Sequence, residues 1–167
     1  MTDPVLRPAA VADCDRIAGW LSDPAINAML SSNLRGAAVT AQALALGLRR
    51  RDQFWMLFAL PDSSEPAGLI ALDSIDTIDG IANLWFLLGN PALSGRGLTS
   101  AAIDRFCRLN PVGLHVLTAW IVEGNAASAR CMEKAGFEPA GRIRQGVSLA
   151  GARRDRILMQ RVIGDRV

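Results

Sequence analysis

The sequence predicts an α/β fold in which a mixed, mainly antiparallel sheet is flanked by helices. Residues 54–89 contain three apolar runs of strand length, separated by segments rich in Asp, Ser, Pro and Gly. After residue 98 the apolar pattern alternates between helical and strand periods. No internal repeat, low-complexity tract or long linker interrupts the 167 residues, so we expect one domain over residues 1–167.

The N-terminal part predicts a short strand followed by a helix. Residues 5–7 form an extended run that Pro8 closes. The apolar spacing over about 12–21 is helical, and Asp13 is placed to cap this helix.

Two shorter helices should follow. Pro24 fits the first turn of a helix that carries Met29 and Leu30. Thr40 is the expected cap of a third helix over 41–50.

The middle of the chain predicts an antiparallel meander. Its strands lie at 54–60, 69–75 and 81–89, and the turns between them have the sequences PDSSEPAG and DTIDG. The apolar runs are consistent with strands that lie inside a sheet.

The C-terminal part alternates helices and strands. We expect a helix at about 98–109, a strand at 114–122 and a helix at 126–135. Two further strands, near 137–145 and 153–162, complete a sheet with helices on its faces.

Composition excludes several classes of protein. Half of the residues are hydrophobic and 20% are charged, which favours a packed core over disorder. The net charge of +2 is too small to indicate a nucleic-acid partner. The last quarter is rich in arginine, which indicates either an anionic ligand or partner there or simply a solvated surface; these residues are Arg142, Arg144, Arg153, Arg154, Arg156, Arg161 and Arg166.

The cysteines and the N-terminus point to a reducing compartment. The three cysteines have no metal-type spacing and His115 is the only histidine, which argues against a disulfide framework and a zinc site. The first residues lack a signal-peptide pattern, and no apolar stretch approaches the ~20 residues that span a bilayer. We therefore expect a cytoplasmic protein that binds neither metal nor membrane.

The segment over 83–106 carries the first chemical motif. An apolar strand enters the turn SGRG and continues directly into a helix. Gly95 and Gly97 leave the turn amides accessible, and a helix N-terminus beside them forms an anion site suited to a diphosphate. A P-loop is excluded, because it needs Lys and then Ser or Thr after its last glycine, and here Leu98 and Thr99 follow. A dinucleotide-binding fingerprint is excluded because its third glycine is missing. An ordinary strand-to-helix connection remains the alternative.

The segment over 123–146 carries the second motif. Asn125 is an expected helix cap, and Gly136 is an expected left-handed residue at the end of the same helix. The run NAASARCMEKAGF, placed at this distance after SGRGLT, resembles the second signature of the GNAT superfamily of acyl-CoA N-acyltransferases. The N-terminal run LRPAAVADCDRIAGWLSDP is similar to the RimJ/RimL-like branch of that superfamily.

The resemblance implies a binding site for coenzyme A. In the family the amides of the Gly-rich turn hold the diphosphate; these are Gly95, Arg96, Gly97, Leu98 and Thr99 here. The preceding strand usually bulges and splays, so that the pantetheine arm pairs with its backbone; this stretch is Phe86, Leu87, Leu88 and Gly89. By the same resemblance Asn125 binds the pantetheine region, Ser128 lies near the thioester, and Arg130 is a candidate for the nucleotide phosphates.

The sequence departs from the family at the acid/base positions. Many relatives have a tyrosine where this chain has Met132, and some have a glutamate where it has Trp120; the chain contains no tyrosine. Ser128 is a candidate proton relay and His115 a candidate base, although a local cap and a structural role are the alternatives. Cys131 is nucleophilic only if its thiolate is stabilised, and otherwise it is a packing residue.

The resemblance thus implies an N-acetyltransferase that moves an acetyl or other acyl group from acetyl-CoA to a primary amine by direct attack in a ternary complex. The expected acceptor is a small amine, such as an amino sugar, amino acid or antibiotic. The alternatives are a protein N-terminus of the ribosomal-protein type and a non-catalytic acyl-CoA-binding module. A homodimer is expected from the habit of the family, and Trp85 or Trp120 is expected to line the acceptor slot.

Overall fold

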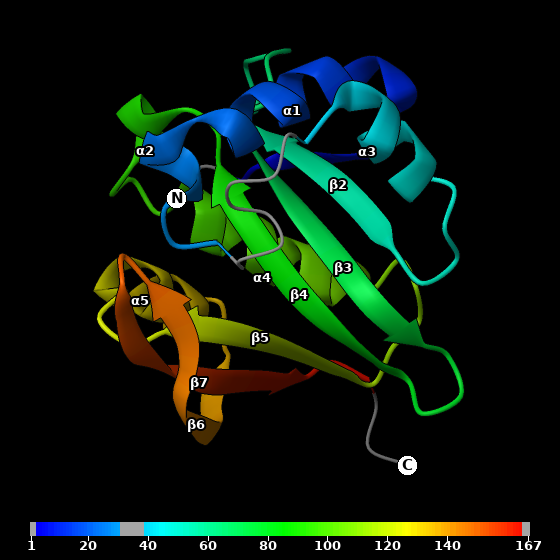
Figure 1. The fold of residues 1–167 in the computed structure, drawn as a ribbon. Coiled ribbons are helices and arrows are strands. Elements are labelled where there is room, and N and C mark those ends of the chain that lie inside the picture. The colour runs from blue at the N-terminus through cyan, green and yellow to red at the C-terminus, as the bar shows by residue number, and fades with distance from the viewer. Residues whose placement is uncertain (1–2, 31–38, 165–167) are drawn as a thin grey trace.

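The computed structural model describes residues 3–30 and 39–164 (Figure 1). Its first half contains β1 (Val5–Pro8), the 3-10 turn η1 (Val11–Asp13), α1 (Cys14–Ser22), α2 (Pro24–Asn27), α3 (Ala41–Gly47), β2 (Phe54–Ala59), β3 (Gly68–Asp76) and β4 (Ile81–Leu88). Its second half contains the 3-10 turn η2 (Pro91–Leu93), α4 (Leu98–Leu109), β5 (Val116–Val122), α5 (Ala126–Lys134), β6 (Glu138–Leu149) and β7 (Ala152–Val162). Arg166 of the arginine-rich tail lies outside the described residues.

The strands form one seven-stranded sheet in the order β1-β2-β3-β4-β5-β7-β6. Neighbouring strands are antiparallel except β4 and β5, which are parallel. The expected meander is formed by β2, β3 and β4, and the predicted mixed, mainly antiparallel α/β fold is confirmed.

Helices cover both faces of the sheet (Figure 1). On one face, Ile17 and Leu21 of α1 and Leu44 of α3 pack against buried residues of the meander. On the other face, Ile103 and Phe106 of α4 belong to the larger core, which α5 joins through its buried Met132. The apolar faces of these amphipathic helices thus account for the two layers.

The first helix begins differently from the prediction. Residues 11–13 form a 3-10 turn, and Asp13 makes no side-chain cap on α1. Its carboxylate instead accepts two hydrogen bonds from the Arg7 guanidinium, at 2.8 and 2.7 Å, and one from the Ala10 N–H at 2.8 Å. The bonds from Arg7, and then the one from Ala10, hold the pKa of Asp13 below its usual value.

Other boundaries also differ from the sequence prediction. The second helix ends at Asn27, before Met29 and Leu30. The third helix ends at Gly47 instead of continuing to residue 50, although Thr40 caps it as expected by accepting from the Ala43 N–H. The last two strands extend beyond the predicted ranges into a long hairpin, whose turn uses positive φ at Ala150 and Gly151. Strand pairing continues where the apolar pattern stops, because backbone hydrogen bonds do not require apolar side chains.

The central feature of the sheet is an opening between β4 and β5. The two strands pair only where Ile81, Ala82 and Asn83 face residues 116–118. Beyond these pairs they diverge, as Figure 1 shows. The predicted splaying of the strand is therefore present, whereas the β3–β4 register stays regular from Asn83 to Leu88.

The expected bulge is absent from residues 86–88, where the register is regular. The irregular pairing lies in β3 between Asp73 and Asp76, where Ser74 has a φ of 52°. At the far end of β4 the Ala67 carbonyl accepts from both Gly89 and Asn90, at 2.8 and 3.1 Å. Gly89 and Asn90 thus oppose one residue of the neighbouring segment, which is a bulge pattern at the last residue of the predicted stretch.

In the described part of the chain, the helices are too short or too polar to cross a membrane.

Candidate active site

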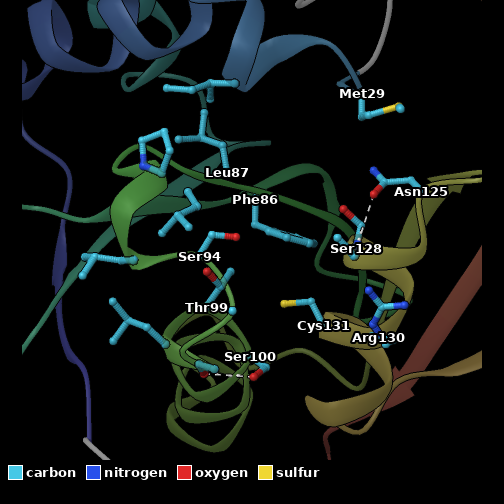
Figure 2. Close-up of a pocket in the computed structure, with 18 of the residues that line it drawn as sticks. Met29, Phe86, Leu87, Ser94, Thr99, Ser100, Asn125, Ser128, Arg130 and Cys131 are labelled. Carbon is cyan, nitrogen blue, oxygen red and sulfur yellow. Dashed lines mark hydrogen bonds between the residues drawn. The ribbon is translucent and has the colours of Figure 1, made fainter.

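A cavity of about 460 Å³ lies at the opening between β4 and β5 (Figure 2). The start of α4 and the exposed side of α5 form two of its walls, and residues of α2 and its C-terminal extension form a third. Its volume falls in the range of ~300–1,000 Å³ that is usual for small-molecule sites. The cavity is therefore large enough for part of an extended ligand.

The Gly-rich turn presents the N-terminus of α4 to this cavity. Gly95 and Gly97 have φ values of 75° and 76°, which lie in the left-handed region that glycine tolerates. Gly97 is the N-cap residue, no side chain caps the helix, and its first turn holds no acidic residue. The Ser100 hydroxyl donates to the Gly97 carbonyl at 2.9 Å and leaves the first amides uncovered. The positive end of a three-turn helix thus faces the cavity.

The N-terminus of α5 forms the facing wall. The Asn125 side-chain oxygen accepts from the Ser128 N–H at 3.1 Å, which confirms the predicted cap (Figure 2). The cap uses the backbone N–H of Ser128 and not the Ser128 hydroxyl. The hydroxyl lies on the cavity wall, and among the described residues it has no protein hydrogen-bond partner.

The edge of β4 supplies the third polar group. Alternate residues of a strand direct their N–H groups to opposite neighbours. Because the Gly89 N–H bonds to Ala67 on the β3 side, the amides of Leu88 and Phe86 are directed toward the opening, where β5 no longer pairs. The Phe86 ring projects into the space between the Gly-rich turn and α5 (Figure 2).

The structure brings together most of the residues that the two motifs predicted. Residues on three separate elements line the cavity: Phe86, Leu87, Leu88, Gly95, Gly97, Leu98, Thr99, Asn125, Ser128 and Arg130. Arg96 is exposed and does not line it. Gly89 also lies outside the lining; a Cβ at this position would overlap the indole of Trp20. Packing on α1 therefore explains this glycine.

The structure does not bring His115 to the cavity. His115 precedes β5, and its backbone N–H donates to Gly80 at 2.7 Å. Asn125 lies ten positions further along the chain, and the strand between the two residues alone spans about 20 Å at ~3.3 Å per residue. The His115 carbonyl accepts from the Ile163 N–H, which indicates a structural role for this residue. Its position gives no support to a role as base.

Two neighbouring positions of α5 have opposite environments. Met132, which takes the place of the family's tyrosine, is fully buried in the core. Cys131 lines the cavity, with its sulfur directed toward the start of α4 (Figure 2). Burial raises the pKa of the Cys131 thiol to about 12, so it stays protonated near neutral pH.

Sequence reasoning missed part of the cavity wall. Ala25, Ile26, Met29 and Leu30 line it from the side of α2, and Lys134 lines it from the last turn of α5. Their apolar or basic character is ordinary for surface segments, and only the tertiary arrangement places them here. The one local signal is Met29, a large apolar side chain that is 45% exposed.

Within residues 3–30 and 39–164, no cluster of three or more His, Cys, Asp or Glu side chains could hold a metal ion.

Solved structures share this architecture. A spermidine N-acetyltransferase from Vibrio cholerae, in complex with CoA and spermine, superimposes with a TM-score of 0.84 over 96% of each chain at 16% sequence identity. A ribosomal-protein-S5-alanine acetyltransferase from Vibrio fischeri superimposes with a TM-score of 0.79, also at 16% identity, over 99% of this chain and 96% of the other. At such identities the likeness concerns the fold.

The family is established by the sequence itself. No curated protein matches the chain. The model of the acetyltransferase (GNAT) domain matches residues 5–138, which is most of the chain and includes the Gly-rich turn and α5. The chain therefore belongs to the GNAT family of acetyltransferases.

Proposed function

We propose that this protein transfers an acetyl group from acetyl-CoA to the primary amine of a small molecule, by direct attack in a ternary complex. The observation that carries the proposal is the parting of β4 from β5 beside the uncapped N-terminus of α4. This arrangement places an unpaired strand edge and an anion site on one cavity.

The geometry supports a specific placement of acetyl-CoA. Its diphosphate would bind the amides of the turn over 95–99, because these amides are uncovered and lie at the positive end of α4. Arg130 and Lys134 line the same cavity and have no ion-pair partner in the described part of the chain, so they can meet the nucleotide phosphates. The pantetheine arm would pair with the free edge of β4.

The chemical step needs few side chains. The neutral amine attacks the thioester carbonyl, the C–N bond forms, and the C–S bond breaks with release of the CoA thiolate. The Leu88 N–H, directed into the opening, would stabilise the negative charge on the carbonyl oxygen. The Ser128 hydroxyl would pass its proton to the thiolate and regain one from water, and that water would take up the proton that the amine loses.

Orientation is expected to supply most of the acceleration. Met132 takes the usual position of the family's acid, and its buried thioether has no proton to donate. Positioning two reactants can supply up to ~7–11 kcal/mol, whereas a positioned acid or base contributes ~10²–10⁴-fold in rate. A rigid cavity formed by two helices and a strand is suited to the larger of these effects.

We further propose a homodimer that acts in the cytoplasm. A protein N-terminus is the alternative acceptor, since a ribosomal-protein acetyltransferase has the same fold. A small amine is favoured because a second pocket, which lies between β4 and β5 beside Asn125 and Ser128, has a small volume of about 50 Å³.

A screen of acetyl-CoA consumption over a panel of amines and N-terminal peptides tests this function. We expect release of free CoA with at least one small amine, and a decrease in kcat of up to about a hundredfold in Ser128→Ala with acetyl-CoA affinity retained. Tight binding of acetyl-CoA without turnover on any acceptor would contradict the enzyme and indicate a non-catalytic binding module.

A further inference from the structure

The pocket between β4 and β5 has a composition that restricts the acceptor. It opens beside Asn125 and Ser128, where the thioester is proposed to lie, so this inference rests on the proposed function. Met29 and Leu30 line it from the N-terminal part of the chain, and Trp85 lines it from β4. Apart from Asn125 and Ser128 at the α5 end, the residues that line the pocket have apolar side chains.

Two indoles line this pocket from the two strands that part. Trp85 packs with the cluster under α1 and meets Trp55 edge to face, with ring centroids 6.3 Å apart, so its position is fixed. Ala119 and Ile121 of β5 belong to the core under α4, so Trp120 between them is directed to the opposite face of the sheet. A flat apolar group that enters from this face meets aromatic surface on both strands.

Trp120 is accompanied by a cation. The Arg156 guanidinium of β7 lies over the indole, 5.4 Å from the ring centroid, which is within cation–π range. The nearby carboxylates are used elsewhere: Glu123 accepts from Arg142 at 2.6 Å, and Asp155 bonds Arg142 and the Gln145 N–H. In the described ranges Arg156 therefore has no carboxylate partner.

The described lining of the site carries no acidic side chain. No Asp or Glu is among the described residues that line the cavity or the pocket, whereas Arg130 and Lys134 are. A polyamine would have to bury several ammonium groups here without a counter-charge, which is strongly unfavourable.

We infer that the acceptor is an amino-acid-like compound with one amine, one carboxylate and an aromatic or branched apolar side chain. Its side chain lies against Trp120 and Trp85, and its carboxylate pairs with Arg156. Arg156 and Trp120 are thus specificity-determining residues, which act on binding and not on the bonds that form and break. A polyamine is excluded as the preferred acceptor, although the same fold occurs in an enzyme solved with spermine.

Initial rates of CoA release with phenylalanine, phenethylamine and spermidine test this inference. We expect the wild-type protein to have the highest kcat/KM with phenylalanine. Arg156→Gln should raise the KM for phenylalanine roughly ten- to a hundredfold, the range of a hydrogen bond between charged groups, and change kcat little. The same variant should leave phenethylamine unaffected, because this amine has no carboxylate.

Arg154→Gln is the matched control, since Arg154 lies two residues away on β7 and is exposed without an aromatic neighbour. It should leave all three KM values unchanged, and Arg156→Lys should restore part of the phenylalanine affinity. A preference for spermidine, or an equal KM shift for phenylalanine and phenethylamine, would overturn the inference and leave acetyl transfer intact. No turnover with the three amines in a protein that binds acetyl-CoA also overturns it, whereas loss of acetyl-CoA binding itself contradicts the proposed function.

Discussion

Consecutive residues of α5 have different roles because the helix turns by about 100° per residue. Cys131 lines the cavity, whereas Met132, the next residue, is buried in the core. The position that carries an acid in many relatives is therefore a packing position here. Near this position, the Ser128 hydroxyl and the protonated Cys131 thiol line the cavity.

The state of Cys131 leads to a prediction about the route of transfer. Because burial raises the thiol pKa to about 12, the thiolate is a negligible fraction at neutral pH, and an acetyl-enzyme should not form. Incubation with acetyl-CoA alone should leave the intact mass unchanged. Cys131→Ser should retain kcat within about tenfold, because direct attack by the amine does not use the sulfur.

An acetyl adduct on Cys131, or a loss of more than about a hundredfold in Cys131→Ser without loss of stability, would contradict direct attack.

Local residue roles were predictable where a single turn of chain decides them. Asn125 caps α5 and Gly136 ends it with a φ of 78°, as the sequence indicates. Asp13 has the same local pattern as a cap, but the Arg7 guanidinium reaches it from β1 and the carboxylate turns to that partner. A contact between two elements thus overrides a local preference, and no property of residue 13 alone could show it.

At the scale of the element, β4 connects both layers of the molecule to the site. Its buried side chains alternate between the two apolar clusters, and its C-terminal half has no partner on the β5 side. Gly89, directly after this strand, lies against Trp20 of α1. The position of the strand edge therefore depends on this close approach.

Gly89→Ala tests this dependence. The added methyl group would overlap the Trp20 indole, so we expect a loss of about 1–3 kcal/mol in the free energy of unfolding and weaker acetyl-CoA binding. Denaturant unfolding of the variant, and of Gly89→Ala combined with Trp20→Ala, measures the effect. The free energy of unfolding of the double variant should fall by less than the sum of the losses in the two single variants.

Additive effects would show that Gly89 and Trp20 are not coupled. Gly95→Ala is a useful comparison, because its Cβ would meet no atom within 4 Å and its effect should come from the positive φ alone.

The boundaries of most elements were predictable, and their partners were less so. The helix over 98–109 and the strands of the meander match the apolar periods of the sequence closely. The hairpin of β6 and β7 extends past its apolar pattern, and the bulge at Ser74 has no sequence signal that we can name. Pairing between backbones decides these features, and one sequence does not reveal it.

At the scale of the whole molecule, the cavity combines segments that are far apart in sequence. The Gly-rich turn and α5 were predictable because their motifs resemble those of a family with a known order of elements. The wall from α2 and the cation–π pair of Trp120 with Arg156 were not, because they depend on where β7 and the N-terminal helices pack. Trp120 itself was among the residues expected near the acceptor slot, and it lines the small pocket in which we propose that the acceptor binds.

The central claim is that the uncapped start of α4 binds the diphosphate of acetyl-CoA. Thr99 allows a direct test, because it lines the cavity within the first helical turn and its backbone does not require glycine. Thr99→Glu places a carboxylate on the proposed anion site, while an acid in the first turn should stabilise the helix by about 0.3–1 kcal/mol. Thr99→Gln is the neutral control of the same shape.

Calorimetric titration of the three proteins with acetyl-CoA provides the decisive measurement. We predict that Thr99→Glu remains folded and loses affinity by at least about a hundredfold, because a carboxylate about 4 Å from a diphosphate is repelled by up to several kcal/mol. Thr99→Gln should bind within about tenfold of the wild-type protein. Equal affinity of the Glu and Gln variants would contradict the claim and place the diphosphate elsewhere.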